Sequence, residues 1–130
     1  MKEPLTITVQ EFGEMLKSVC APDTAAGGGK GWTPENPTFG HCAVASLVVQ
    51  DLFGGELLRV SLEGTEFSEG RSHYFNRLPS GEIVDLTLAQ FQGRLPANLP
   101  AQERTREYVL SAPDTDNRYR ILWERLADAY

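Results

Sequence analysis

The feature that most restricts the fold is an apolar stretch that runs from His41 to Phe53, with Cys42 at its start. Its sequence, HCAVASLVVQDLF, would place apolar residues on almost every side of a helix, whereas a surface helix carries them on one side. Gly54 and Gly55 follow at once, and glycine commonly ends a helix. We therefore predict a buried helix that other parts of the chain must cover.

Amphipathic helices are predicted near both ends of the chain. At about residues 8–20, the pattern Thr8-Val9-Gln10-Glu11 is typical of a capping box. Apolar residues then recur at helical spacing: Phe12, Met15, Leu16 and Val19. A second stripe lies at about residues 114–129 and comprises Tyr119, Leu122, Trp123, Leu126 and Tyr130. Both stripes are interpreted as faces that pack in a core.

Strand and turn signals fill the space between the helices. A strand is expected at 56–62, and a hairpin at 73–78 and 82–85 with its turn at Pro79-Ser80-Gly81. Thr87-Leu88-Ala89-Gln90 has the pattern of a second capping box and predicts a short helix that carries Phe91. A helical turn is expected at 106–110. The chain is therefore predicted to form one α+β domain over residues 1–130, with its site segment at about 32–91.

Composition narrows the classes of function. A chain of 130 residues favours a single domain, and its 41% of apolar residues is enough for an ordinary core. The net charge of −6 disfavours a general nucleic-acid binder and a protein of anionic membrane surfaces. Two cysteines give no disulfide framework, and neither a signal segment nor an apolar run of about 20 residues is visible. We expect a cytoplasmic protein that needs no cofactor and acts on an unknown protein, peptide or small amide.

Cys42, His73 and Asp85 occur in the order that a thiol catalyst requires. A helix N-terminus carries partial positive charge and free N–H groups, both of which favour a thiolate nucleophile. His73 would accept and return a proton, and Asp85 would orient the imidazole. If the turn keeps a simple register, His73 lies opposite Thr87, and Asp85 lies one diagonal step away on the same face, at ~7–8 Å. The three residues are therefore candidates for a catalytic triad.

Asn36 is the candidate donor for an oxyanion, together with the backbone amide of Cys42. Its side-chain amide lies six residues upstream of the thiol, and Pro37 would restrain its backbone. His41 is an alternative donor because it adjoins Cys42. Asn76 is an alternative to Asp85, but strand alternation places it on the face opposite to His73.

Less specific interpretations compete with the triad. A cysteine in an apolar helix is usually a small buried hydrophobe, and a histidine beside aromatic residues is often only a half-buried polar group. Cys42, His73 and Asp85, with His41, are also the kinds of residue that bind zinc, but no close pair of ligands is present and we assign no metal residues. A non-catalytic binding module therefore remains the alternative to an enzyme.

Several segments resemble the bacterial YunG-like family, from about Trp32 to the terminal helix. They are Asn36–Val44, Gln50–Gly55, Ser72–Leu78, Val84–Thr87, Arg106–Leu110 and Pro113–Thr115. The chain has His41 where glutamine is expected before the cysteine, and Phe75 where tryptophan is expected.

The Cys-His-Asp order is also similar, more distantly, to that of papain-like hydrolases, transglutaminases and toxin deamidases. This second resemblance implies a papain-like core, in which the helix that bears the nucleophile packs on a small antiparallel sheet. The activity it implies is cysteine-dependent amide hydrolysis or acyl transfer, of the peptidase, amidase, deamidase or transglutaminase type.

Overall fold

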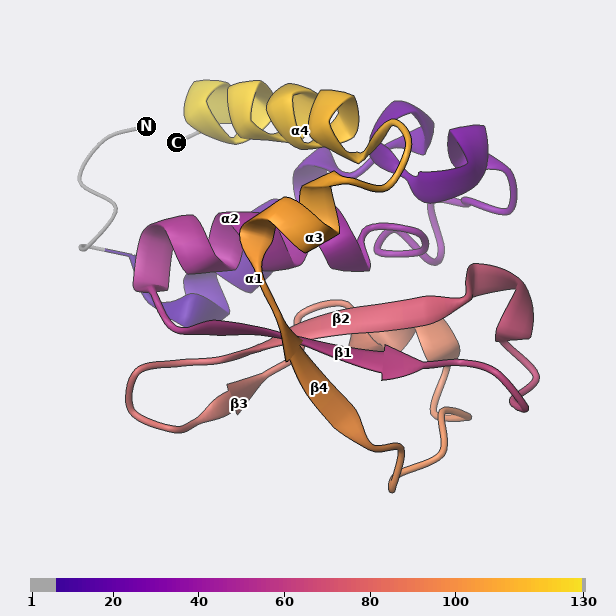
Figure 1. The fold of residues 1–130 in the computed structure, drawn as a ribbon. Helices are drawn as coiled ribbons and strands as arrows, with labels where there is room; N and C mark the ends of the chain where they lie inside the picture. Colours follow the sequence, from indigo (N-terminus) through magenta and orange to yellow (C-terminus); the bar gives the residue numbers. More distant parts are fainter. Residues whose placement is uncertain (1–6, 130) are drawn as a thin grey trace.

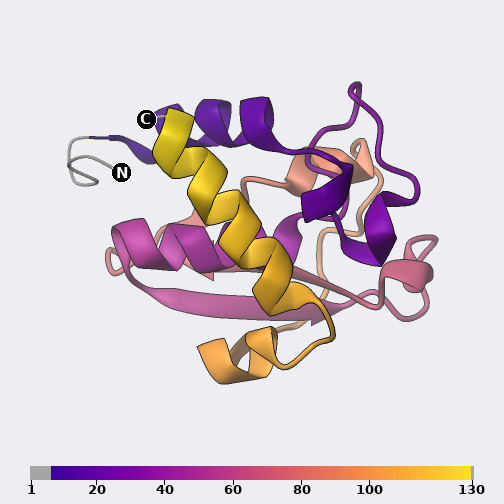
Figure 2. The ribbon, with the colours of Figure 1, turned by 90° about the horizontal axis from the view of Figure 1, so that it is seen from above.

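Helices cover one face of a small sheet in the computed structural model, which describes residues 7–129 (Figure 1). The buried helix α2 spans Cys42–Phe53 and lies directly on the sheet. The outer helices α1 (Val9–Val19) and α4 (Thr115–Ala129) lie above it. Seen from above, α4 crosses over α2, with α1 at its side (Figure 2). The α+β class expected from the sequence is confirmed.

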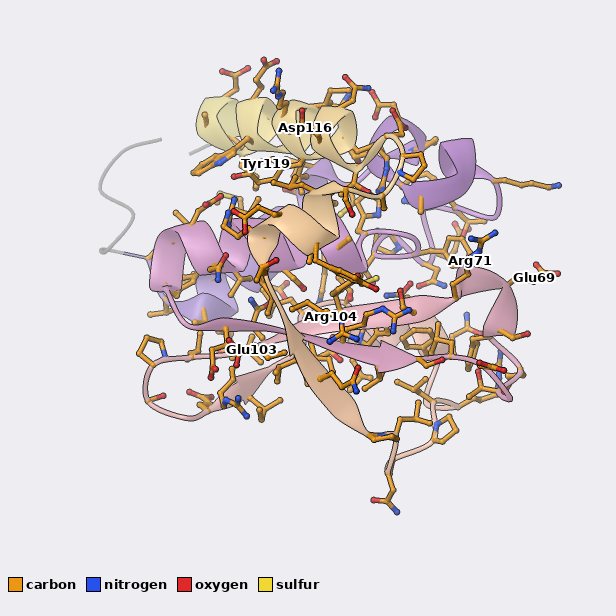
Figure 3. All side chains as sticks on the ribbon, in the orientation of Figure 1. Glu69, Arg71, Glu103, Arg104, Asp116 and Tyr119 are labelled. Atoms are coloured by element: carbon orange, nitrogen blue, oxygen red, sulfur yellow. The ribbon has the colours of Figure 1, made fainter. Side chains whose placement is uncertain are left out.

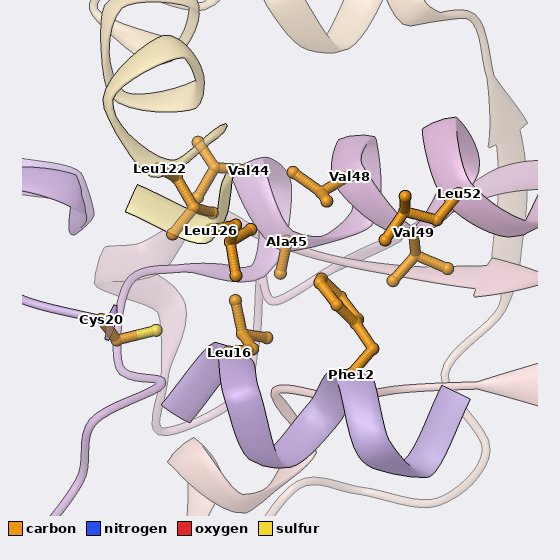
Figure 4. Packing of buried hydrophobic residues seen from close by; sticks show 10 residues of the cluster. All are labelled: Phe12, Leu16, Cys20, Val44, Ala45, Val48, Val49, Leu52, Leu122 and Leu126. Atoms are coloured by element: carbon orange, nitrogen blue, oxygen red, sulfur yellow. The ribbon is translucent and has the colours of Figure 1, made fainter. Parts of the chain in front are cut away.

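The main core forms where these three helices meet. Figure 4 shows side chains of α1 and α4 converging on one side of α2. The buried members are Phe12, Leu16, Cys20, Val44, Ala45, Val48, Val49, Leu52, Leu122 and Leu126. The other side of α2 contributes Leu47, which packs with Leu57 of the sheet and with Val109. Burial on both sides explains why the sequence of α2 lacks a polar face.

The first helix begins as its sequence indicates. The Thr8 hydroxyl accepts a hydrogen bond from the Glu11 amide, and the Glu11 carboxylate accepts one from the Thr8 amide, which completes the capping box. At the other end of the chain, Tyr119 and Trp123 pack against the core, as predicted. Tyr130, the last residue of the predicted stripe, lies outside the described residues.

The sheet has four antiparallel strands in the order β3-β2-β1-β4. The strands are β1 (Glu56–Ser61), β2 (Ser72–Arg77), β3 (Ile83–Val84) and β4 (Ala101–Arg104). Asn76 pairs with Val84, and extending this register places His73 opposite Thr87. The register inferred from the Pro79-Ser80-Gly81 turn is therefore confirmed.

Two parts of the chain differ from the sequence expectations. Residues 101–104 form the edge strand β4, for which no element was predicted. Leu88–Phe91 forms only a 3-10 turn, η5, and the Thr87 side chain makes no capping hydrogen bond. The expected capping box is therefore wrong, because Gln90 bonds to a distant segment of the chain. The predicted helical turn at 106–110 is confirmed as α3 (Arg106–Leu110).

Candidate functional site

Cys42 is the first residue of α2, and the loop before it is held tightly. His41 donates its amide to the Thr38 carbonyl, and Gly40 adopts φ 75°, where a Cβ would lie 2.9 Å from the Ala26 nitrogen. The His41 side chain makes no capping hydrogen bond to α2. The first backbone amides of α2 therefore receive no hydrogen bond acceptor from His41. The Cys42 thiol is free and half-buried, and its sulfur lies 4.0 Å from the Ser72 carbonyl oxygen of β2.

His73 and Asp85 form a direct pair at the hairpin. The Nε2 atom of His73 lies 2.6 Å from Oδ2 of Asp85, and the imidazole is fully buried. Its ring packs against the rings of Phe75 and Phe91, with centroid distances of 5.8 and 4.8 Å. Because Asp85 follows directly after β3, the short strand itself delivers the carboxylate to the histidine.

The charge on His73 is set by its neighbours. Burial acts to lower the pKa of His73, but the hydrogen bond to Asp85 and the negative charges of Cys42 and Asp85 raise the pKa from its ordinary value of 6.5 to about 9. The imidazole therefore holds a proton at neutral pH. Asp85 and Cys42 both act on this one ring, so the structure brings the three candidate residues together.

Unpartnered polar atoms gather at this site. Among residues 7–129, five buried side-chain atoms have no hydrogen-bond partner, and four of them belong to residues 73–90. These four are His73 Nδ1, Asp85 Oδ1, Thr87 Oγ1 and Gln90 Nε2. Leaving a buried polar atom unpaired costs about 1–3 kcal/mol, so these four side chains are candidates for contact with a substrate.

Gln90 is a site residue that the sequence interpretation missed. Its Oε1 accepts a hydrogen bond from the Gly40 amide at 3.1 Å, which fixes Nε2 as the free donor. Gly40 lies two residues before Cys42, so the Gln90 side chain reaches the loop that leads into α2. Asn36 donates its side-chain amide to the main-chain carbonyl of Gln90 at 3.1 Å. No periodicity in the sequence links these positions, since they are joined only by the tertiary fold.

Both ring nitrogens of His41 lie within hydrogen-bond distance of other groups in the protein. Its Nδ1 lies 2.8 Å from the Phe39 carbonyl oxygen, and its Nε2 lies 2.7 Å from the Thr24 hydroxyl. Burial and the nearby charge of Arg118 lower the pKa of His41 to about 4, although hydrogen bonds to backbone groups oppose this shift. The ring is neutral at pH 7 and donates its one N–H to Phe39. It has no N–H left for an oxyanion.

The structure also places Asn76 and the residues considered as zinc ligands. Asn76 points to α2, where its amide donates to the Ser46 carbonyl oxygen at 3.0 Å, as alternation predicted. The proposed zinc ligands do not form a cluster: within the described residues, no three His, Cys, Asp or Glu side chains are grouped so that they could hold a metal ion.

A groove of about 310 Å³ adjoins the histidine–aspartate pair. His73 and Asp85 contribute its polar wall, and the remaining lining is apolar, from Val60, Phe75, Leu88, Leu95, Pro96, Ala97 and Leu99. The pair is therefore reachable from solvent on one side, although the imidazole itself is covered.

Comparisons with known proteins indicate one family. A family model described as YunG protein matches residues 8–130. Over 61 residues, the chain is 36% identical to the Bacillus subtilis (strain 168) protein named "Uncharacterized protein YunG". This alignment covers 47% of each chain, so it spans about half the length of the curated relative. No solved structure matches the chain. Within residues 7–129, no helix is both long and apolar enough to cross a membrane.

Proposed function

The chain belongs to the YunG family, and we propose that it is a cysteine-dependent amide hydrolase or acyl transferase with a papain-like core. Cys42 is the nucleophile, His73 the proton carrier and Asp85 the residue that orients His73. The papain-like assignment is supported by the order of these residues and by a nucleophile helix that packs on a small antiparallel sheet.

One observation carries the proposal. His73 is buried, uses Nε2 for Asp85, leaves Nδ1 without a partner and interacts with Cys42. A structural histidine would normally satisfy both ring nitrogens, as His41 does in the same molecule. A free buried nitrogen beside a thiol is what proton transfer between the two requires.

The reaction follows from these positions. The thiolate form of Cys42 is the nucleophile, and its sulfur attacks the carbonyl carbon of an amide and forms a C–S bond. His73 gives its proton to the leaving amine as the C–N bond breaks, and a thioester remains. His73 then accepts a proton from water as the oxygen attacks the thioester; the C–S bond breaks, the acid is released, and the Cys42 thiolate and the protonated His73 are restored. An amine in place of water gives acyl transfer.

The oxyanion formed during this attack needs hydrogen-bond donors. The backbone amide of Cys42 is one, because the first amides of a helix have no partners within the helix. The free Nε2 of Gln90 is the second, and Asn36 holds the Gln90 backbone in place. The donor role that the sequence suggested for Asn36 thus becomes, in this proposal, a positioning role.

Reaction of the thiol with iodoacetamide tests the proposal without a known substrate. At about pH 6.5, Cys42 should react roughly tenfold faster than free cysteine, and His73→Ala should remove this advantage. Cys20 serves as an internal control, because burial raises the pKa of Cys20 to about 12 and its thiol is covered. Cys42→Ser should therefore abolish labelling. Equal, slow labelling of the wild type and His73→Ala would reject the catalytic assignment and favour a binding module.

The role of Gln90 has its own prediction. A short N-acetyl peptide aldehyde adds reversibly to a catalytic thiol and places its oxygen where the oxyanion forms. Gln90→Ala should weaken aldehyde binding by roughly tenfold or more, because one donor is lost, and should leave the iodoacetamide rate near that of the wild type. Asn36→Ala should have a smaller effect. If Asn36→Ala weakened binding more than Gln90→Ala, Asn36 itself would be the donor.

A further inference from the structure

The sheet continues past the start of α2, and this extension forms a polar surface in front of the helix. Leu57 and Asn76, which are paired across β1 and β2, contact the helix at Leu47 and Ser46. The next residues on the same face are the pairs Arg59–Tyr74 and Ser61–Ser72. Because Tyr74 already packs near the first turn of α2, the outermost pair lies beyond the helix.

A pocket of about 320 Å³ occupies this position. It is lined by Arg59, Ser61, Glu63, Ser68 and Arg71, which supply two guanidinium groups, two hydroxyls and one carboxylate. The lining is thus positive by one charge in a chain whose net charge is −6. Within residues 7–129, neither arginine takes part in an ion pair.

Arg71 is held in an unusual conformation at the edge of this pocket. Its φ is 66°, a value that costs a non-glycine residue about 1 kcal/mol or more. Two backbone hydrogen bonds of 3.0 Å hold this residue. The Arg71 amide donates to the Ser68 carbonyl oxygen, and the Arg71 carbonyl oxygen accepts from the Leu62 amide. Figure 3 shows Arg71 at the corner before β2, with its side chain on the helical side of the sheet.

The pocket adjoins the proposed nucleophile. Arg71 directly precedes Ser72, whose carbonyl oxygen lies 4.0 Å from the Cys42 sulfur. Tyr74, the cross-strand partner of Arg59, lies within electrostatic reach of both Arg59 and Cys42. A group bound between the two arginines would therefore lie next to the thiol.

We propose that the pocket binds a carboxylate of the substrate, so that the site acts on amides that carry an acidic group close to the reacting carbonyl. Guanidinium groups bind carboxylates through paired hydrogen bonds, and the hydroxyls of Ser61 and Ser68 add donors. The N-terminus of α2 adds partial positive charge. This inference rests on the proposed function, because it assigns a substrate class to the same thiol.

Iodoacetate and iodoacetamide provide a matched pair of probes, since they differ only in a carboxylate and a carboxamide. We expect the ratio of the iodoacetate to the iodoacetamide rate at Cys42 to exceed that of free cysteine by about tenfold. The positive charge of His73 also attracts iodoacetate. The arginine variants are therefore needed to show how much of the preference for iodoacetate comes from the pocket. Arg59→Gln and Arg71→Gln should each lower the ratio of the iodoacetate to the iodoacetamide rate severalfold, because the ratio cancels any change in the thiol itself. Arg120→Gln removes a charge from an exposed position on α4 and should change neither rate.

The outcomes separate the two proposals. A Cys42 that reacts rapidly with iodoacetamide, but with the same probe ratio in the wild type and both arginine variants, overturns the carboxylate pocket alone. A Cys42 that is unreactive with both probes overturns the proposed function. Should Arg59→Gln lose iodoacetamide reactivity through misfolding, the exposed Arg71 still decides the matter through Arg71→Gln.

Discussion

The two histidines of the chain lie in opposite electrostatic environments. His41 is buried near the positive charge of Arg118 and stays neutral, with its pKa lowered to about 4. His73 is equally buried, but Asp85 and Cys42 offset the cost of its charge and raise its pKa to about 9. Burial alone therefore does not set the charge of either ring, because neighbouring charges decide it.

This contrast predicts how stability depends on pH. Between about pH 4 and 6.5, the unfolded chain binds a proton at residue 41 that the folded chain excludes, so the free energy of unfolding should rise with pH. The stabilisation from His73 is complete below about pH 6.5 and is lost as the pH rises through about 9. Each effect is on the order of 3 kcal/mol at most.

Urea unfolding across this pH range measures both effects. His41→Gln should flatten the acid limb and leave the alkaline limb intact, whereas His73→Gln should do the reverse. The assignment of His73 as a charged group would be wrong if His73→Gln left the alkaline limb unchanged.

At the scale of elements, the junction between α2 and β1 depends on Gly55. Its φ is 90°, and a Cβ there would lie 2.2 Å from the Arg77 carbonyl oxygen of the neighbouring strand. Gly64 has a similar φ of 81°, but a Cβ there would meet no atom within 4 Å. A side chain at Gly64 would therefore meet backbone strain alone, whereas one at Gly55 would meet both strain and a steric clash.

Alanine at these two positions should have unequal effects. Gly55→Ala should lower the free energy of unfolding by about 2–5 kcal/mol, because it adds a clash to the strain. Gly64→Ala should cost about 1 kcal/mol, from strain alone. Chemical denaturation of both variants checks this, and equal losses would show that the close approach of Gly55 to Arg77 does not limit stability.

Helices whose signals lie within their own sequence could be predicted. Elements that form only through contacts with distant parts of the chain could not. The capping box at Thr8 and the apolar run of α2 are local signals, and each gave the correct helix. The strand β4, with the sequence Ala101-Gln102-Glu103-Arg104, has no apolar alternation, because it is an exposed edge defined only by its pairing with β1. Likewise, Gln90 looked like a cap partner but bonds to Gly40, 50 residues away.

At the scale of the whole molecule, Arg118 connects the terminal helix α4 to the loops that precede Cys42. Its guanidinium donates to the carbonyl oxygens of Thr24 and Gly40 at 3.2 and 3.4 Å, and the side chain is buried. Three segments far apart in the sequence are thus joined at one side chain. The position of Cys42 therefore depends on the docking of α4.

Arg118→Met should lower the free energy of unfolding by about 2 kcal/mol, because the Thr24 carbonyl loses its donor, whereas the Gly40 carbonyl keeps the hydrogen bond from the Ala26 amide. It should also slow the reaction of Cys42 with iodoacetamide in the fraction that remains folded, since Gly40 loses one of the three hydrogen bonds that hold it. Arg120→Met, on the exposed face of the same helix, should change stability by less than about 0.5 kcal/mol. A folded Arg118→Met protein with unchanged thiol reactivity would contradict this coupling.

The proposed function requires Cys42 and His73 to form one coupled pair, and an NMR titration of His73 measures this coupling. With only two histidines, the His41→Gln variant assigns both signals. In the wild type, His73 should keep its proton to about pH 9. In Cys42→Ala, which removes the negative charge at this position, the titration of His73 should move to lower pH. An identical titration of His73 in the two proteins would contradict the account.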